Sequence, residues 1–178
     1  MRTSALAILG TLVAIAPARA DAVRRAVVPM TRADGAVCDL LRSDALDRCR
    51  PIATEGPATV YQSGSKHSGI RRVVLAVAAG DEVLVSPPID VRADRLDSTV
   101  ATVRPIAIDG RPGLVLDVVS TWRDGVAPAR AEAVVGCAPA GRGWRCAVVD
   151  VGACAAAIGD DATVSTACGP TASLALAR

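Results

Sequence analysis

The sequence predicts a mainly β fold, α+β at most: an antiparallel meander that forms a sandwich or a partly closed barrel, with an N-terminal helical segment and three disulfides. Three observations predict it. Short runs of alternating apolar and polar residues follow one another over residues 58–151, separated by Gly, Pro and Asp. No helical pattern interrupts them, so the long crossovers that parallel strands need are missing. Six cysteines follow an export-type N-terminus.

Residues 1–20 have the pattern of a secretory signal peptide. Arg2 is followed by an apolar run over residues 5–15 and by Ala-Arg-Ala at residues 18–20. The run is about half the ~20 residues that a membrane-spanning helix needs. We therefore expect cleavage after Ala20 and a single secreted or periplasmic domain over residues 21–178, with no membrane span in the mature chain.

The charge and the aromatic content exclude several classes of partner. The chain has a formal net charge of +2, and loss of Arg2 and Arg19 with the leader leaves basic and acidic groups equal in number. A neutral surface does not favour nucleic acid. Phe is absent and the aromatic residues are three, too few for a platform on which bases stack: Tyr61, Trp122 and Trp144. The core must be aliphatic, and disulfides would compensate for its small side chains.

The cysteines are expected to be structural. Six cysteines allow fifteen pairings, and loop closure favours the nearest neighbours. There is no C-x-x-C motif and the single histidine, His67, is remote from every cysteine, so neither a metal site nor a redox site nor a cofactor is expected. The predicted pairs are Cys38–Cys49, Cys137–Cys146 and Cys154–Cys168.

The stretch VVGCAPAGRGWRCAVVD, residues 134–150, predicts a disulfide-closed hairpin. Its Pro and Gly residues allow the chain to reverse between the cysteines. Opposed residues of an antiparallel pair are close enough for a disulfide. If Cys137 stands opposite Cys146, the two-residue period of a strand pairs the flanking residues in the same register: Val135 with Val148 and Ala133 with Asp150.

A helical segment is expected over residues 31–50, where Val37, Leu40 and Leu41 form one stripe. Eleven positions along one helix would separate the Cα atoms of Cys38 and Cys49 by about 16 Å. A disulfide needs them within about 7 Å. The helix must therefore break, and Ser43-Asp44 would cap a second short turn over residues 45–49.

The sheet is expected over residues 58–151, with tight turns at Gly80-Asp81 and in DGRPG, residues 109–113. The pattern LVLDVVSTWR, residues 114–123, predicts one buried and one solvated face. Residues 152–178 are expected to form a stapled C-terminal segment with one short strand near 171–177. The expected strands of the sheet are 58–63, 70–79, 82–86, 89–93, 98–109, 114–123, 129–137 and 144–151.

The catalytic candidates lie in QSGSKHSG, residues 62–69. Ser63 and Lys66 match S-x-x-K, in which a lysine activates a serine. Ser65 and His67 offer a second nucleophile and a base. Two fixed positions recur by chance and no companion motif is present, so a solvated loop is favoured over catalysis.

These observations favour a non-catalytic exported domain, associated with the cell envelope or secreted, whose sheet edges or loops bind another exported protein. Three alternatives remain open. The chain would be a β-barrel carrier of a small lipophilic ligand if a lumen of several hundred Å³ were empty. It would be a small serine hydrolase if Ser63 or Ser65 met Lys66 or His67 beside an oxyanion hole. It would be a protease inhibitor if APAGRGW, residues 138–144, formed a rigid exposed loop.

Overall fold

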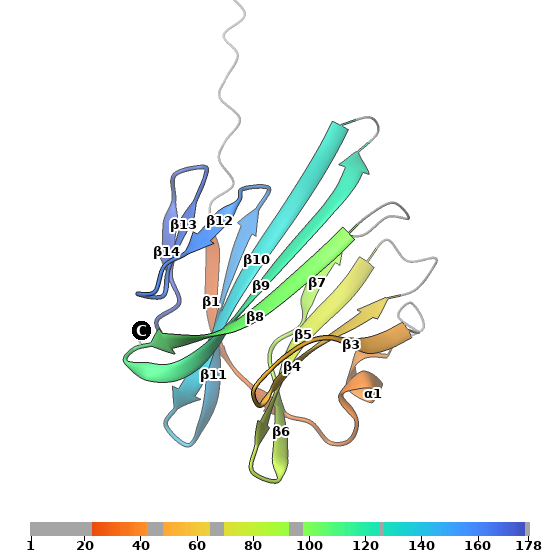
Figure 1. Cartoon of the computed structure of the whole chain (residues 1–178), viewed down its shortest axis with the longest axis vertical. Helices are drawn as coiled ribbons and strands as arrows, with labels where there is room; N and C mark the ends of the chain where they lie inside the picture. The colour runs from red at the N-terminus through yellow and green to blue at the C-terminus, as the bar shows by residue number, and fades with distance from the viewer. Residues whose placement is uncertain (1–22, 43–47, 65–69, 93–97, 125–126, 177–178) are drawn as a thin grey trace, which may run out of the picture.

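The fold is a layered antiparallel β structure, described by a computed structural model over residues 23–42, 48–64, 70–92, 98–124 and 127–176. Two large sheets, here sheets A and B, lie face to face (Figure 1). A small three-stranded sheet covers part of the outer face of sheet A. A short helix, α1 (Val37–Leu41), covers part of the outer face of sheet B.

Sheet A consists of a meander extended by the N-terminal strand. Strands β8 to β11 pair with their neighbours in sequence, and β1 adds to β11 across more than one hundred residues of chain. Its strands, in spatial order, are β1 (Arg24–Pro29), β11 (Gly143–Gly152), β10 (Ala127–Ala140), β9 (Arg111–Asp124) and β8 (Ser98–Ile108).

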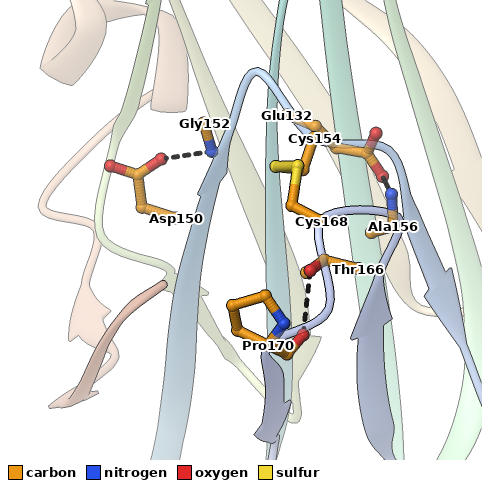
Figure 2. Close-up of a disulfide and its surroundings, with 8 residues drawn as sticks. All are labelled: Glu132, Asp150, Gly152, Cys154, Ala156, Thr166, Cys168 and Pro170. Atoms are coloured by element: carbon orange, nitrogen blue, oxygen red, sulfur yellow. Dashed lines mark hydrogen bonds between the residues drawn. A yellow bond between two sulfur atoms is a disulfide. The ribbon is translucent and has the colours of Figure 1, made fainter. Parts of the chain in front are cut away.

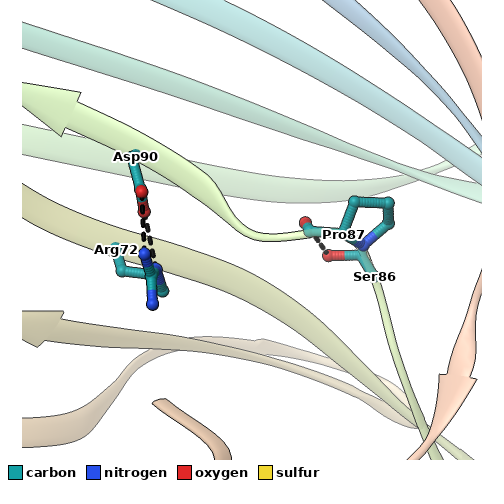
Figure 3. A network of polar contacts seen from close by, with 4 residues as sticks. All are labelled: Arg72, Ser86, Pro87 and Asp90. Atoms are coloured by element: carbon teal, nitrogen blue, oxygen red, sulfur yellow. Dashed lines mark hydrogen bonds and ion pairs between the residues drawn. The ribbon is translucent and has the colours of Figure 1, made fainter. Parts of the chain in front are cut away.

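Sheet B contains six strands, of which β6 and β7 share one edge of β5. Between these two pairings, Ser86 completes the hydrogen bonding of β5. Its Oγ accepts a hydrogen bond from the N–H of Leu75 at 3.0 Å. The same Oγ donates to the carbonyl of Pro87 at 3.0 Å (Figure 3). The strands are β2 (Thr31–Arg32), β6 (Glu82–Val85), β5 (Ile70–Ala79), β4 (Ala58–Gly64), β3 (Arg48–Glu55) and β7 (Ile89–Arg92).

Three apolar clusters hold the layers together. The main core joins the inner faces of sheets A and B and includes Val60, Leu75, Leu116 and Val135, each fully buried. A second cluster joins sheet A to the small sheet, and a third joins sheet B to α1. The small sheet contains β12 (Ala156–Ile158), β13 (Thr163–Thr166) and β14 (Thr171–Ser173).

The large sheets form a sandwich and not a closed barrel, because β8 and β3 remain as edges at one side. These two edge strands lie beside each other (Figure 1). The mainly β, antiparallel fold predicted from the sequence is thereby confirmed, and the described sheets do not form a closed barrel.

All three disulfides join the cysteines that are nearest in sequence: Cys38–Cys49, Cys137–Cys146 and Cys154–Cys168. The register of the 134–150 hairpin is the expected one, since Cys137 pairs with Cys146, Val135 with Val148 and Ala133 with Asp150. Disulfides persist in oxidising compartments, so these bonds indicate an extracellular or periplasmic environment. Within the described ranges no helix has both the length and the apolarity to cross a membrane.

The helical segment expected over residues 31–50 is wrong at both ends. Thr31–Arg32 is a strand, and the helix covers only Val37–Leu41. Its early end allows Cys49 to return within 5.5 Å of Cys38, Cα to Cα. Of the second helical turn expected at 45–49, residues 45–47 lie outside the described residues, and Arg48 and Cys49 belong to β3. Pairing with β4 outweighs the weak helical preference of this segment.

The solvated face expected on β9 is also wrong over part of its length. Leu114, Leu116 and Val118 face sheet B as predicted. On the other face Val115 is only 1% exposed, because the small sheet covers it. The C-terminal segment therefore forms a sheet with three strands, where the sequence predicts one. Strands β1 and β3 likewise extend the sheets before residue 58.

Candidate functional site

The inner face of sheet B changes from apolar to polar at one end of the sandwich. Along β4, Val60 is fully buried, whereas Gln62, two residues later on the same face, is partly exposed. Along β5, Val73 is fully buried, whereas Arg71 is partly exposed. Arg50 of β3 pairs with Gln62 and shares this face. At this end the inner face of sheet B is therefore lined by polar and charged side chains.

A groove of about 440 Å³ opens here between the edge strands of the two sheets. We call it the seam groove, because it follows the seam at which β8 of sheet A meets β3 and β4 of sheet B (Figure 1). Its walls combine two guanidinium groups with a side-chain amide, a hydroxyl and short apolar side chains. The lining residues are Arg50, Pro51, Ile52, Gln62, Arg71, Thr99, Val100 and Ala101.

The two arginines of the seam groove differ from the neighbouring Arg72 in their ion pairing. Within the described ranges, neither Arg50 nor Arg71 has a carboxylate at ion-pair distance. The next residue, Arg72, points to the opposite face and donates to both carboxylate oxygens of Asp90, at 2.7 and 2.8 Å (Figure 3). That hydrogen bonding raises the pKa of Arg72. Among the described residues, no carboxylate therefore neutralises the charge of Arg50 or Arg71.

Thr99 supplies an unused polar group on the opposite wall. Its Oγ1 is buried and has no hydrogen-bond partner in the described part of the chain. A buried hydroxyl without a partner destabilises the protein relative to one that is hydrogen-bonded. A bound ligand that offered a donor or acceptor to Thr99 would remove this cost.

A second polar cluster lies on the outer face of sheet A. The side chain of Glu132 is 1% exposed and forms an ion pair with Arg130. Its Oε1 accepts a hydrogen bond from the N–H of Ala156 at 3.1 Å (Figure 2). Asp117 of β9 lies nearby, and its pKa is raised to about 6 by burial and by the charge of Glu132. Because the small sheet covers Glu132, this cluster joins two layers and offers less access than the seam groove.

The residues proposed for catalysis are not assembled by the described structure. Ser63 is fully buried. It pairs with Cys49 on β3 and Arg72 on β5, and it shares the face of Tyr61 beneath α1. A nucleophile must be reached by its substrate, so this position does not suit Ser63 for catalysis. Ser65, Lys66 and His67 lie outside the described residues.

The carrier and inhibitor alternatives stay predictions, and two features of the described fold bear on them. A carrier needs an empty lumen, whereas the inner faces of sheets A and B meet in one apolar core. An inhibitor needs an extended exposed loop, whereas residues 138–144 continue β10 and β11 into a tight turn at Gly141-Arg142. No group of three or more His, Cys, Asp or Glu within the described ranges is placed to hold a metal ion.

The sequence analysis did not single out Arg50 or Arg71. A signal was present in IRRVVLAV, residues 70–77, where Arg71 has the parity of Val73, Leu75 and Val77 and so belongs to the inner face. Comparison with protein-family models, with curated proteins and with solved structures finds no match for this chain.

Proposed function

We propose that this chain is a non-catalytic exported interaction module that binds another exported protein at the seam groove. The observation that carries the proposal is the pair Arg50 and Arg71, which lines a groove and has no carboxylate partner within the described ranges. Arginine is enriched at the centre of protein interfaces, where its guanidinium forms several directed hydrogen bonds.

The composition of the groove supports a protein partner. Pro51, Ile52, Val100 and Ala101 add apolar surface beside the charges. Protein interfaces combine apolar contact with a few charged groups in this way. The overall charge after loss of the leader would be zero, so attraction of a partner would depend on the local arginines and not on a general field.

The proposal includes export by a signal peptide that is removed after Ala20. The pattern of residues 1–20 and the three disulfides support this route. Edman sequencing of the exported protein should begin at Asp21. The site of action is then the periplasm, the cell envelope or the medium.

The test is capture from the exported proteins of the same cell, with the mature domain as bait. The double variant Arg50→Glu/Arg71→Glu should capture at least tenfold less of the partner protein than the wild type does. Arg24→Glu/Arg142→Glu is the matched control, because it makes the same change of charge at two exposed positions outside the groove. Equal capture by both variants, or no specific capture by the wild type, would refute the proposal.

A further inference from the structure

The edge strand β8 carries none of the residues that usually protect an edge along the part that borders the seam groove. Its first six residues, Ser98-Thr-Val-Ala-Thr-Val103, contain no charge and no proline. Val100, in the middle of this part, is 55% exposed. An uncharged, β-branched edge strand presents unpaired backbone groups with which another strand can pair.

The edge strand across the groove is protected in the ways that natural sheets use. β3 carries Pro51 and a register irregularity between Pro51 and Ala53, and Arg48 and Glu55 at its ends add charge. Proline removes a backbone donor, and a bulge bends the edge away from a second strand. An added strand would therefore pair with β8 and have β3 as a wall.

The charges decide between the two simplest occupants. A second copy that paired through β8 would bring two more copies of Arg50 and Arg71 to the same interface, with no acid on residues 98–103 to offset them. Like charges placed together across an interface oppose association. A strand that carries carboxylates would instead form charge-assisted hydrogen bonds with both guanidinium groups.

We infer that the seam groove accepts an acidic, extended segment of the partner as an additional strand along β8. The inference rests on the proposed function and specifies its partner. Alternate side chains of an added strand point to the same face, so every second residue would face Arg50 and Arg71. The residues between would lie on the side of Val100 and would be apolar or β-branched. The recognised pattern is thus an alternation of Glu or Asp with residues such as Val or Thr.

The test uses synthetic peptides with the mature domain, so it does not depend on identifying the natural partner. The probe is fluorescein-labelled (Glu-Val)5 with blocked ends, measured by fluorescence anisotropy. We expect saturable binding at micromolar to millimolar concentration. (Lys-Val)5 should bind at least tenfold more weakly. Arg50→Glu/Arg71→Glu should weaken binding of the acidic probe at least tenfold, and Arg24→Glu/Arg142→Glu should change it less than twofold.

Two methylated forms of the probe test the backbone pairing. Only every second N–H of an added strand points toward β8. N-methylation of all Glu residues and N-methylation of all Val residues should therefore have unequal effects: one set abolishes binding and the other is tolerated within a few-fold. Equal effects of the two sets would overturn the added strand, while arginine dependence would leave the proposed function intact.

Two further outcomes would overturn the inference. The first is absence of binding of (Glu-Val)5 at millimolar concentration. If a native protein were still captured in a way that depends on Arg50 and Arg71, the proposed function would stand without the added strand. The second is a dimer of the mature domain in sedimentation velocity that Val100→Lys abolishes, which would identify a second copy as the occupant. Failure of both the peptide and the capture experiment would refute the function and the inference together.

Discussion

Glu132 on β10 accepts a hydrogen bond from the backbone N–H of Ala156 on β12, at 3.1 Å, across 24 positions of sequence (Figure 2). The same carboxylate forms an ion pair with Arg130 and is almost completely buried. One side chain thus joins sheet A to the small C-terminal sheet of β12 to β14, beside the disulfide between Cys154 and Cys168.

Replacement of this carboxylate should loosen the C-terminal sheet. Glu132→Ala leaves the Ala156 N–H without its acceptor and removes the ion pair with Arg130, and we expect a loss of about 2–3 kcal/mol in the free energy of unfolding. Glu132→Gln keeps an acceptor for Ala156 and should lose about half as much. Urea denaturation followed by circular dichroism measures both. Equal stability of the Ala variant and the wild type would show that this contact does not hold the layers together.

Asp117→Asn should stabilise the protein at alkaline pH. Burial, and then the neighbouring Glu132 carboxylate, raise the pKa of Asp117 from 3.8 to about 6. The folded state therefore binds this proton more tightly than the unfolded state. Stability from this group is complete below about pH 4 and is lost as the pH rises through 6.

The shift of about two pKa units corresponds to about 3 kcal/mol, and partial exposure of Asp117 reduces the expected difference to about 1 kcal/mol. The variant should equal the wild type near pH 4 and exceed it by this amount at pH 8, in urea denaturation at each pH. A difference that is independent of pH would show that Asp117 is not protonated in the folded state near pH 5.

The three disulfides should differ in their resistance to reduction. Cys137 and Cys146 are fully buried, whereas Cys168 is exposed and Cys38 and Cys49 are partly exposed. A thiolate must reach a sulfur atom in order to attack it. Mild dithiothreitol, followed by alkylation and mass spectrometry, should label the pairs 154–168 and 38–49 well before 137–146. Before reduction, the folded protein should contain no titratable thiol, because all six cysteines are paired.

Gly136→Ala should disturb the packing between sheet A and the C-terminal sheet. A Cβ atom at Gly136 would lie 2.9 Å from Cβ of Leu174 and 3.0 Å from Cδ1 of Ile108. Such overpacking costs about 1–3 kcal/mol. Gly143→Ala is the control, because a Cβ atom there meets nothing within 4 Å. Thermal unfolding should show a lower melting temperature for the first variant only.

Much of sheets A and B follows from short-range patterns. The strands expected at 70–79 and 98–109 agree with β5 and β8 to within one residue. The turn in DGRPG is shorter than expected. Within this stretch only Asp109 and Gly110 have positive φ, 51° and 71°, and the next strand begins at Arg111. Two consecutive residues of this kind form the type I′ turn that suits a two-residue hairpin.

The parts that the sequence analysis missed depend on distant contacts. β1 pairs with β11, and β12 to β14 cover the outer face of sheet A. The local sequence pattern of these two segments does not indicate where they pack, because their partners lie far away in the chain. The seam groove was missed for the same reason. Arg50 and Arg71 have no motif around them, and Thr99 joins them only because β8 of the other sheet lies alongside.

The sequence by itself determined the antiparallel β class and the positions of most strands, and it favoured the pairs of cysteines and the register of the 134–150 hairpin that the structure shows. These features depend on the alternation of side chains and on closure of short loops, both of which act over a few residues. Only the tertiary structure decided that both faces of sheet A are covered, that Asp117 and Glu132 meet, and that two arginines face an open edge strand. Those relationships arise when separate sheets stack, and stacking is set by the summed burial of apolar faces, a quantity that no single segment contains.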